Sequence, residues 1–370
     1  MVSFLIELSL RQRILVIILT GMLAAGGLYA FQTMPIDAFP DVTTVLVQVV
    51  TKAEGFSPAE IERFVTFPLE LQLTGAPGLR EIRSFSKVGL SMITVVFDDD
   101  VDIYLARQVV LERVLEVQEL LPVGAVSQLV PNTTGLGEVY QYFLQGPHDD
   151  DEGHETTEAE LTERRTLQDW VLRPLLKGLP DVVDVNSMGG FVKQYQVMVE
   201  PGLLRKYALA LHDVFGAVAR NNANAGGSIL EKHGEKYIIR GIGLIQSLED
   251  IEHIVIKEVG GTPVYVRDVA EVRFGHAVRH GASVYNAKRE VVTGIVLMLR
   301  GANARDVVEH VKEQVRSIHA KDLLPDGLRI VPFYDRIELI TAALKTIYKA
   351  LLEGVICVVV ILFLFLGEVR

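Results

Sequence analysis

Cysteine is nearly absent from this sequence. The single residue of this type, Cys357, lies in an apolar run close to the C-terminus. The rest of the chain therefore has no means of forming disulfides or thiolate metal sites. No arrangement of nucleophile and base is present either, and the two Gly-x-Gly pairs, at 135–137 and 241–243, lack the third glycine of a dinucleotide-binding loop. These absences argue against an enzyme.

Basic residues are absent from one long stretch. Between Pro147 and Glu163 the chain has eight acids and no Lys or Arg, and without these acids the formal net charge of −11 becomes −3. Because the remainder is close to balance, the sequence has no basic surface of the kind that binds a phosphate backbone. Nucleic acid is therefore not an expected partner.

Long apolar runs occur twice. The first, Ile14 to Met34, has about 20 residues, which is long enough to cross a bilayer core as a helix, and Pro35 ends it. The run is too long for a signal peptide, and no small-residue cleavage site follows it. Arg11 and Arg13 on its N-terminal side predict that the N-terminus lies in the cytoplasm.

The second run, Ala350 to Leu366, continues a predicted helix of mixed charge that begins at Arg336. Its one carboxylate, Glu353, is a candidate functional residue because an acid is costly inside a membrane. The alternative is that Glu353 pairs at the membrane surface with Lys349, one helical turn away. The chain stops shortly after this run. We therefore expect part of a longer protein, with two membrane helices around a water-facing body.

The body between the two runs predicts an α+β fold. Ser57 and Pro58 open a helix, and Glu60 occupies the capping-box position. The first half reads as β-α-β-β-α-β, the split βαβ pattern, with strands at 43–51, 79–87, 90–98 and 125–130 and helices at 57–73 and 102–120.

A second copy of this pattern is interrupted. It is predicted from strands at 139–146, 182–188, 271–274, 282–287, 291–299 and 328–332 and helices at 166–177 and 304–319. Residues 192–269 are predicted to form an inserted unit with a hairpin at 228–231 and 236–240. Trp170 falls on an apolar helical stripe and is predicted to be in the core. The same prediction holds for Met188, Met198 and Met298, which fall on separate strands.

Short motifs follow one another in a defined order. They are PIDAFPDV at 35–42, SFSKVGLSMITVVF at 84–97, GEVYQYFL at 137–144, RTLQDW at 165–170, NNANAGG at 221–227 and PFYDR at 332–336. With these motifs the chain resembles, over nearly its whole length, the heavy-metal-efflux branch of the resistance-nodulation-division (RND) transporters.

The resemblance implies a homotrimeric, multi-pass pump of the bacterial inner membrane with a large periplasmic domain. Such a pump is a secondary active transporter that exchanges protons for a heavy-metal cation and needs no cofactor. The implied partners are a periplasmic adaptor protein, an outer-membrane channel and the lipid bilayer. The acids that couple transport to protons, and the main cation site, would lie beyond this sequence.

The resemblance also gives the domains, which agree with the strand pattern. Residues 1–34 would hold the first membrane helix, and 334–370 the second. A first ferredoxin-like porter subdomain would cover 35–135 and a second 136–190 with 271–333. A docking subdomain at 191–270 would be inserted into the second.

A candidate metal site lies in the acidic stretch. His148 and His154 occur there among carboxylates, including Asp150. Imidazole with carboxylate suits Zn²⁺, Co²⁺ or Ni²⁺ better than Cu⁺. The alternative is a solvated loop, and this alternative is favoured because the spacing fits no defined ligand template.

A candidate interface is marked by the resemblance alone. Asn221, Asn222, Asn224, Gly226 and Gly227 resemble the tip of the docking hairpin, where Asn and Gly tolerate positive φ. In the family this hairpin reaches into the neighbouring subunit. An ordinary turn within one domain is the alternative.

Two other functions stay open. One is an RND-type multidrug exporter, against which NNANAGG and RTLQDW argue. The other is a membrane-anchored periplasmic binding or adaptor protein, against which the abrupt stop after the second apolar run argues.

Overall fold

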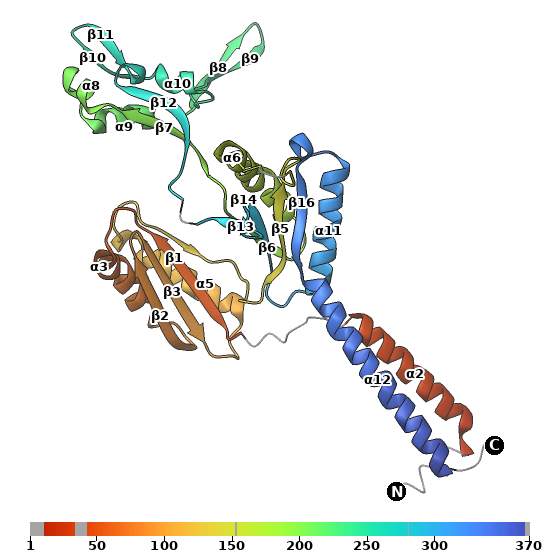
Figure 1. Ribbon diagram of the computed structural model, residues 1–370. Helices are drawn as coiled ribbons and strands as arrows, with labels where there is room; N and C mark the ends of the chain where they lie inside the picture. Colours follow the sequence, from red (N-terminus) through yellow and green to blue (C-terminus); the bar gives the residue numbers. More distant parts are fainter. Residues whose placement is uncertain (1–10, 34–42, 152–153, 280, 367–370) are drawn as a thin grey trace.

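The computed structural model describes residues 11–33, 43–151, 154–279 and 281–366. It contains three folded units of mixed helix and sheet, from which two long helices extend away together (Figure 1). Pro35, which the sequence predicts to end the first apolar run, lies outside the described residues.

The first α/β unit covers residues 43–130 and has the predicted β-α-β-β-α-β order. Its four strands form an antiparallel sheet in the order β2-β3-β1-β4, and its helices cover one face of that sheet (Figure 1). The elements are β1 (Leu46–Lys52), α3 (Pro58–Ile61), η1 (Glu62–Thr66), α4 (Phe67–Leu73), β2 (Leu79–Lys87), β3 (Leu90–Phe97), α5 (Ile103–Val117), η2 (Gln118–Leu120) and β4 (Val126–Leu129).

Local capping explains where the helices of this unit begin. The Ser57 amide donates to Glu60 Oε2 at 2.9 Å, which is the predicted capping box. Asp102 Oδ1 accepts hydrogen bonds from the amides of Tyr104 and Leu105, so α5 begins at Ile103. Both starts are thus encoded in a few adjacent residues.

The second α/β unit repeats the same topology. Its sheet order is β16-β5-β15-β6, which corresponds strand by strand to β4-β1-β3-β2 of the first unit. The elements are β5 (Glu138–Gln145), α6 (Glu158–Leu167), η3 (Gln168–Leu172), α7 (Arg173–Lys177), β6 (Val182–Met188), β13 (Ser283–Tyr285), β14 (Arg289–Val291), β15 (Thr293–Met298), α11 (Ala304–Ala320), η5 (Pro325–Gly327) and β16 (Arg329–Asp335).

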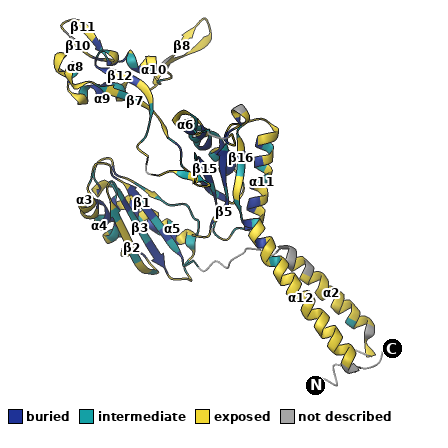
Figure 2. Cartoon of the chain, viewed as in Figure 1, coloured by how far each residue is buried: buried dark blue, intermediate teal, exposed yellow. Residues whose placement is uncertain are grey.

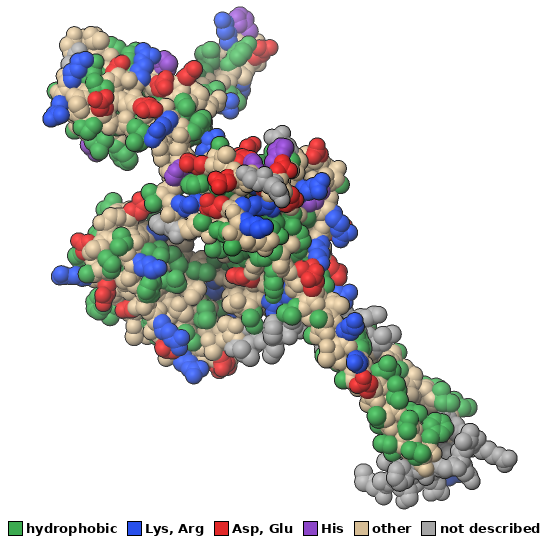
Figure 3. Space-filling model, viewed as in Figure 1, with side chains coloured by type: hydrophobic (Ala, Val, Ile, Leu, Met, Phe, Trp, Pro, Cys, Tyr) green, Lys and Arg blue, Asp and Glu red, His purple; other side chains and the backbone are tan. Residues whose placement is uncertain are grey.

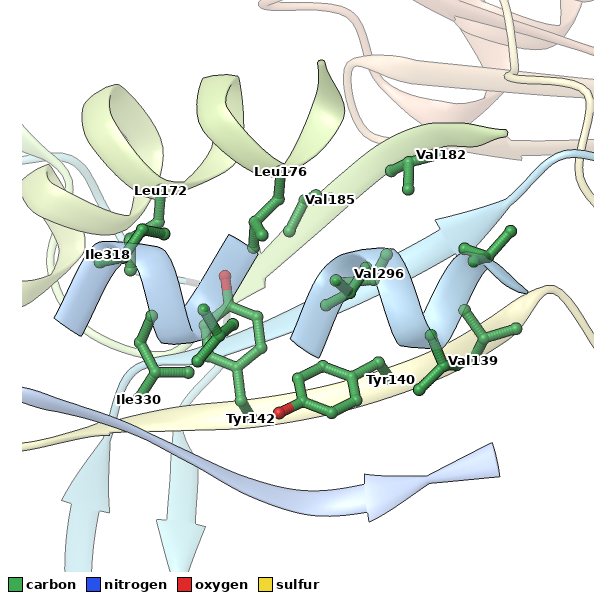
Figure 4. Close-up of a cluster of buried hydrophobic side chains, with 14 of the residues drawn as sticks. Val139, Tyr140, Tyr142, Leu172, Leu176, Val182, Val185, Val296, Ile318 and Ile330 are labelled. Atoms are coloured by element: carbon green, nitrogen blue, oxygen red, sulfur yellow. The ribbon is translucent and has the colours of Figure 1, made fainter. Parts of the chain in front are cut away.

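The core of the second unit lies between this sheet and its helices (Figure 4). Val139 and Val296 come from central strands, and Leu172, Leu176 and Ile318 meet them from the helices. All five side chains are buried, and full burial of an aliphatic side chain contributes about 1.5–3 kcal/mol. This packing holds the segment before the insertion and the segment after it in one unit.

One turn of π-helix interrupts the first helix of each unit. These turns, η1 and η3, end two residues before Pro68 and Pro174 respectively. Proline lacks the N–H and its ring clashes with the carbonyl one turn earlier, and a wider turn relieves that clash. The matching positions of the two π turns reveal the internal repeat.

The π turn also corrects a prediction. It shifts the buried stripe onto Leu161, Gln168 and Leu172, so that Trp170 points outward and is 79% exposed. The core prediction for Trp170, which assumed an unbroken 3.6-residue period, is therefore wrong. Among the methionines, Met298 is buried as predicted, whereas Met188 and Met198 are about half exposed.

The inserted unit covers residues 191–276 and has its own small core. Its elements are β7 (Lys193–Val199), α8 (Pro201–Lys206), α9 (Leu211–Arg220), β8 (Ala225–Lys232), β9 (Glu235–Gly241), α10 (Leu248–Glu252), β10 (Val255–Val259), β11 (Thr262–Tyr265), η4 (Val266–Asp268) and β12 (Ala270–His276). Strand β12 pairs with β7 along its whole length, from Ala270 opposite Val199 to His276 opposite Lys193. Residues 271–274, predicted as a strand of the second porter subdomain, therefore belong to the insertion.

Two helices, α2 (Arg13–Thr33) and α12 (Arg336–Leu366), carry apolar side chains that are mostly exposed (Figure 2). The start of α12 is an exception, because Ile337, Ile340 and Leu344 pack against the core of the second unit. Among the described residues, α12 is the one helix that is long and apolar enough to cross a membrane. The described apolar stretch of α2 is shorter, Ile14–Gly27, so the first crossing stays a prediction.

The turn between β13 and β14 holds two left-handed residues. Asn286 has φ 52° and Ala287 φ 54°, and the Lys288 amide donates to Tyr285 O at 3.1 Å, as in a type I′ turn. A left-handed alanine costs about 1–2 kcal/mol, whereas glycine adopts this conformation freely. We expect Ala287→Gly to raise the thermal midpoint of the second unit. Asn286→Gly is the matched control and should change it less, because Asn already tolerates the conformation.

Candidate functional site

The described part of the acidic stretch contacts the second unit. Asp149 and Arg164 make a two-pronged ion pair, with both nitrogen–oxygen distances at 2.8 Å. Their side chains are 0% and 5% exposed, so the pair is buried. The Gly146 amide donates a further hydrogen bond to Asp149 at 2.9 Å. Asp149 therefore attaches the loop to α6, while His148, Asp150 and Asp151 are exposed.

Two opposing effects act on the Asp149 carboxyl. Burial alone would raise its pKa, but the hydrogen bonds from Arg164 and the Gly146 amide outweigh burial. The net result is a pKa below the ordinary value of 3.8. Asp149 is therefore ionised at neutral pH and has a structural partner, which leaves it unsuited to carry protons or to bind a cation.

Asp150 contacts the β13–β14 hairpin. Its carboxylate lies 3.4 Å from Arg289 and accepts a hydrogen bond from Gln145 at 2.7 Å. Charged side chains of both signs gather with histidines on this part of the molecule (Figure 3). They surround a cavity of about 490 Å³ that is lined by Asp149, Asp150, Asp151, His154, Glu155, Tyr285, Asn286, Lys288 and Arg289.

The two predicted imidazole ligands pair with different carboxylates. His148 Nδ1 lies 3.1 Å from Asp151, and His154 Nε2 lies 3.5 Å from Glu160. The imidazole rings are 6.3 Å apart between centroids. Within residues 11–33, 43–151, 154–279 and 281–366, no group of three or more His, Cys, Asp or Glu side chains is arranged to hold a metal ion. Metal binding by His148, His154 and Asp150 thus stays a prediction.

The residues that the sequence predicts at the tip of the docking hairpin lie at the base of the hairpin. Strands β8 and β9 pair from Ala225 opposite Gly241 to Lys232 opposite Glu235, so the chain reverses at His233 and Gly234. The prediction that Asn221, Asn222, Asn224, Gly226 and Gly227 form the tip is therefore wrong.

The asparagines instead brace the hairpin base. Asn224 Oδ1 accepts from the Gly243 amide at 3.0 Å, and Asn222 Oδ1 accepts from the Ile245 amide at 3.2 Å. These bonds join the chain before β8 to the chain after β9.

The hairpin extends away from the inserted unit (Figure 1). Several apolar side chains of the hairpin are each more than half exposed: Ile229, Leu230, Ile238 and Ile239. Ile229 lies opposite Ile238 on one face of the hairpin, and Leu230 and Ile239 lie on the other face. A free two-stranded hairpin is marginally stable in water, and a partner that covers it would bury these side chains. The hairpin therefore has the character of a docking element.

The membrane carboxylate lies near its predicted partner. Glu353 Oε1 is 3.9 Å from Lys349 Nζ, and both side chains are exposed on α12. This spacing favours pairing at a membrane surface over a proton-carrying role.

Sequence reasoning missed the start of α6. The helix begins at Glu158, eight residues before the predicted 166, because Thr157 and Glu160 form a capping box. The sequence contains this signal as Thr-x-x-Glu, within a run of acids that also indicates a loop. His276 also contacts the start of α6. Its Nε2 lies 3.3 Å from Glu158, and its ring lies 4.7 Å from that of Phe191, where the inserted unit joins the second unit.

Comparison with known proteins gives a consistent result along the chain. The sequence profile described as the AcrB/AcrD/AcrF family matches residues 5–370. Protein HelA of Legionella pneumophila is 44% identical, with 100% of this chain and 35% of that protein covered. The cobalt-zinc-cadmium resistance protein CzcA of Cupriavidus metallidurans is 42% identical, with 99% and 34% covered. The cation efflux system protein CusA of Escherichia coli is 39% identical, with 100% and 34% covered.

A solved structure is also similar. The X-ray structure of a heavy metal efflux pump superposes with a TM-score of 0.87 at 37% identity. The superposition covers 98% of this chain and 35% of that one. The chain thus spans about a third of the length of these relatives.

Proposed function

Because the chain belongs to the AcrB/AcrD/AcrF family, we propose that it is part of an RND pump that exports heavy-metal cations in exchange for protons. One observation carries this proposal. Similarity extends over the whole chain to proteins named for cation efflux and for cobalt-zinc-cadmium resistance. The main cation site and the proton-carrying acids belong, in this proposal, to the rest of the pump.

Both long helices are proposed to cross the inner membrane, with residues 43–335 on the periplasmic side. Ile14, Ile17 and Leu23 on α2 are each more than two-thirds exposed, and α12 exposes an apolar surface from Ile347 onward. In water such surfaces would drive aggregation, whereas a bilayer solvates them and an α-helix satisfies its own backbone hydrogen bonds. Arg11 on the N-terminal side of α2 supports a cytoplasmic N-terminus.

A homotrimer is proposed, with the β8–β9 hairpin of each subunit bound to its neighbour. A head-to-tail contact of this kind closes into a ring when the rotation allows it. The exposed apolar side chains of the hairpin support this role because binding would bury them. A periplasmic adaptor protein and an outer-membrane channel complete the proposed assembly.

Growth tests distinguish this function from drug export. A strain that lacks the complete pump is expected to lose tolerance to at least one of zinc, cobalt, cadmium and copper while it keeps tolerance to dyes. Loss of dye tolerance alone would contradict metal export and point to a multidrug exporter. In vesicles, the purified pump should move the same cation only under an imposed pH gradient. Vesicles whose gradient has been collapsed are the control.

A further inference from the structure

The two ends of the first α/β unit lie side by side. The chain comes in at Thr43 and Thr44, just before β1, and leaves through Val130 after β4. Strands β1 and β4 are neighbours in the sheet, and the Val130 amide donates to Gln48 O at 2.9 Å. Both connections of this unit to the rest of the protein therefore pass through one small region.

A single residue of the second unit binds both connections, the incoming one through its side chain and the outgoing one through its backbone amide. Arg300 Nη2 donates to Thr43 O at 2.6 Å, and Nη1 donates to Thr44 O at 3.2 Å. The Arg300 amide donates to Asn132 O at 3.2 Å. The guanidinium is suited to this task, because its planar fork reaches two acceptors at once and its charge strengthens each bond.

The position of Arg300 is set by a tight turn at the end of a central strand. Arg300 follows β15, the Ala302 amide donates to Leu299 O at 3.1 Å, and Gly301 has φ 81°. These values fit a type II turn, in which the third residue needs positive φ. Helix α11 starts directly afterwards, with Asn303 as its cap. Arg300 is thus fixed to the rigid part of the second unit.

Two further arginines hold the outgoing segment on either side of this point. Arg107 of α5 donates to Val130 O at 2.8 Å, within the first unit. Arg336, the first residue of α12, donates to Leu136 O. The backbone between these bonds, near Asn132, links the first unit to the second.

We propose that Arg300 is a positioning residue that sets the pivot about which the first α/β unit turns on the second unit during transport. This inference rests on the function proposed above and adds to it that the two α/β units move relative to each other. Without the Arg300 side chain, the bonds to Thr43 and Thr44 are lost and only the amide bond to Asn132 remains of these three. The first unit would then adopt a wider range of orientations relative to the second unit. Fewer transport cycles would reach the productive arrangement.

The test measures the spread of inter-unit distances in the complete pump. With Cys357 and any other cysteines replaced, spin labels are placed through Glu119→Cys on the first unit and Lys321→Cys on the second, both exposed positions. We expect Arg300→Ala to widen the distance distribution at least about twofold and to lower kcat for cation transport about tenfold, with little change in KM. Arg300→Lys should fall between Arg300→Ala and the unsubstituted pump, because an ammonium lacks the fork.

Arg165→Lys is the matched control. It weakens an arginine–carbonyl bond of similar length, from Arg165 to Gly189 O at 2.7 Å, but one that lies inside the second unit. It should leave the distance distribution unchanged. If Arg300→Ala does not assemble, Arg300→Gln and Arg300→Lys provide the same comparison. An unchanged distribution in the Arg300 variants would overturn the pivot, whatever their transport rate. Failure of the unsubstituted pump to move any cation would instead overturn the proposed function.

Discussion

Asp149→Ala is expected to destabilise the second α/β unit by roughly 3–5 kcal/mol, the cost typical of removing one partner from a buried ion pair. The variant leaves Arg164, whose side chain is 5% exposed, with no carboxylate at 2.8 Å. It also removes the acceptor for the Gly146 amide. Few substitutions in this chain combine both losses.

A local measurement suits this prediction better than a single melting curve, because a protein of several units does not unfold in one step. Hydrogen–deuterium exchange of peptides from β5 and α6 should become faster in Asp149→Ala. Asp151→Ala is the control, since Asp151 pairs with His148 at an exposed position and should have little effect. Replacing both partners, as Asp149→Leu with Arg164→Met, should recover most of the protection, because the uncompensated charge is then absent.

The same ion pair gives a dependence on pH whose sign follows from the lowered pKa of Asp149. A carboxyl with a lower pKa in the folded state stabilises the fold above the unfolded-state value. It loses this contribution as the pH falls through the folded-state value. In the natural sequence, the protection of β5 and α6 from hydrogen exchange should therefore decrease when the pH is lowered past about 4. In the double variant this acid-dependent loss should be smaller.

Local signals predicted much of the fold, and the successes share a cause. The capping box at Ser57 and Glu60 and the β-α-β-β-α-β order depend on residues that are close in sequence. The same signal at Thr157 lies among acids that also indicate a loop, so the start of α6 is ambiguous from sequence. A fixed 3.6-residue period does not describe the π turn at η3, and it therefore predicts Trp170 in the core.

Other features depend on pairing across long stretches of sequence, which no local pattern contains. The bonds from Arg300 to Thr43 and Thr44 join residues more than 250 positions apart. Strand β12 pairs with β7, and most of the insertion lies between these two strands in the sequence. The candidate site shows the same limit. The sequence predicts that His148 and His154 lie among acids, but it does not predict that Asp149 is bound to Arg164.

The second large effect is expected from Gly294→Ala in β15. Gly294 lies opposite Tyr142 of β5, and a Cβ at this position would overlap the Tyr142 ring. The ring is buried, and its hydroxyl donates to Gln168 at 3.0 Å. The added methyl group must therefore displace the ring from a packed core and break this hydrogen bond. We expect the variant to lose roughly 3 kcal/mol, from overpacking together with a buried polar group left without its partner.

A double-mutant cycle tests this explanation directly. If the overlap is the cause, Tyr142→Leu combined with Gly294→Ala should be less destabilised than the sum of the two single variants by at least about 1 kcal/mol. Gly135→Ala is the control, because a Cβ there meets no atom within 4 Å. The effects are read from hydrogen exchange of the β5 and β15 amides. Additive effects would show that the Tyr142 ring moves away without cost and would contradict the overlap as the cause. Strong coupling would show that Gly294 is retained to make room for Tyr142, and that this contact holds the central strands of the second unit together.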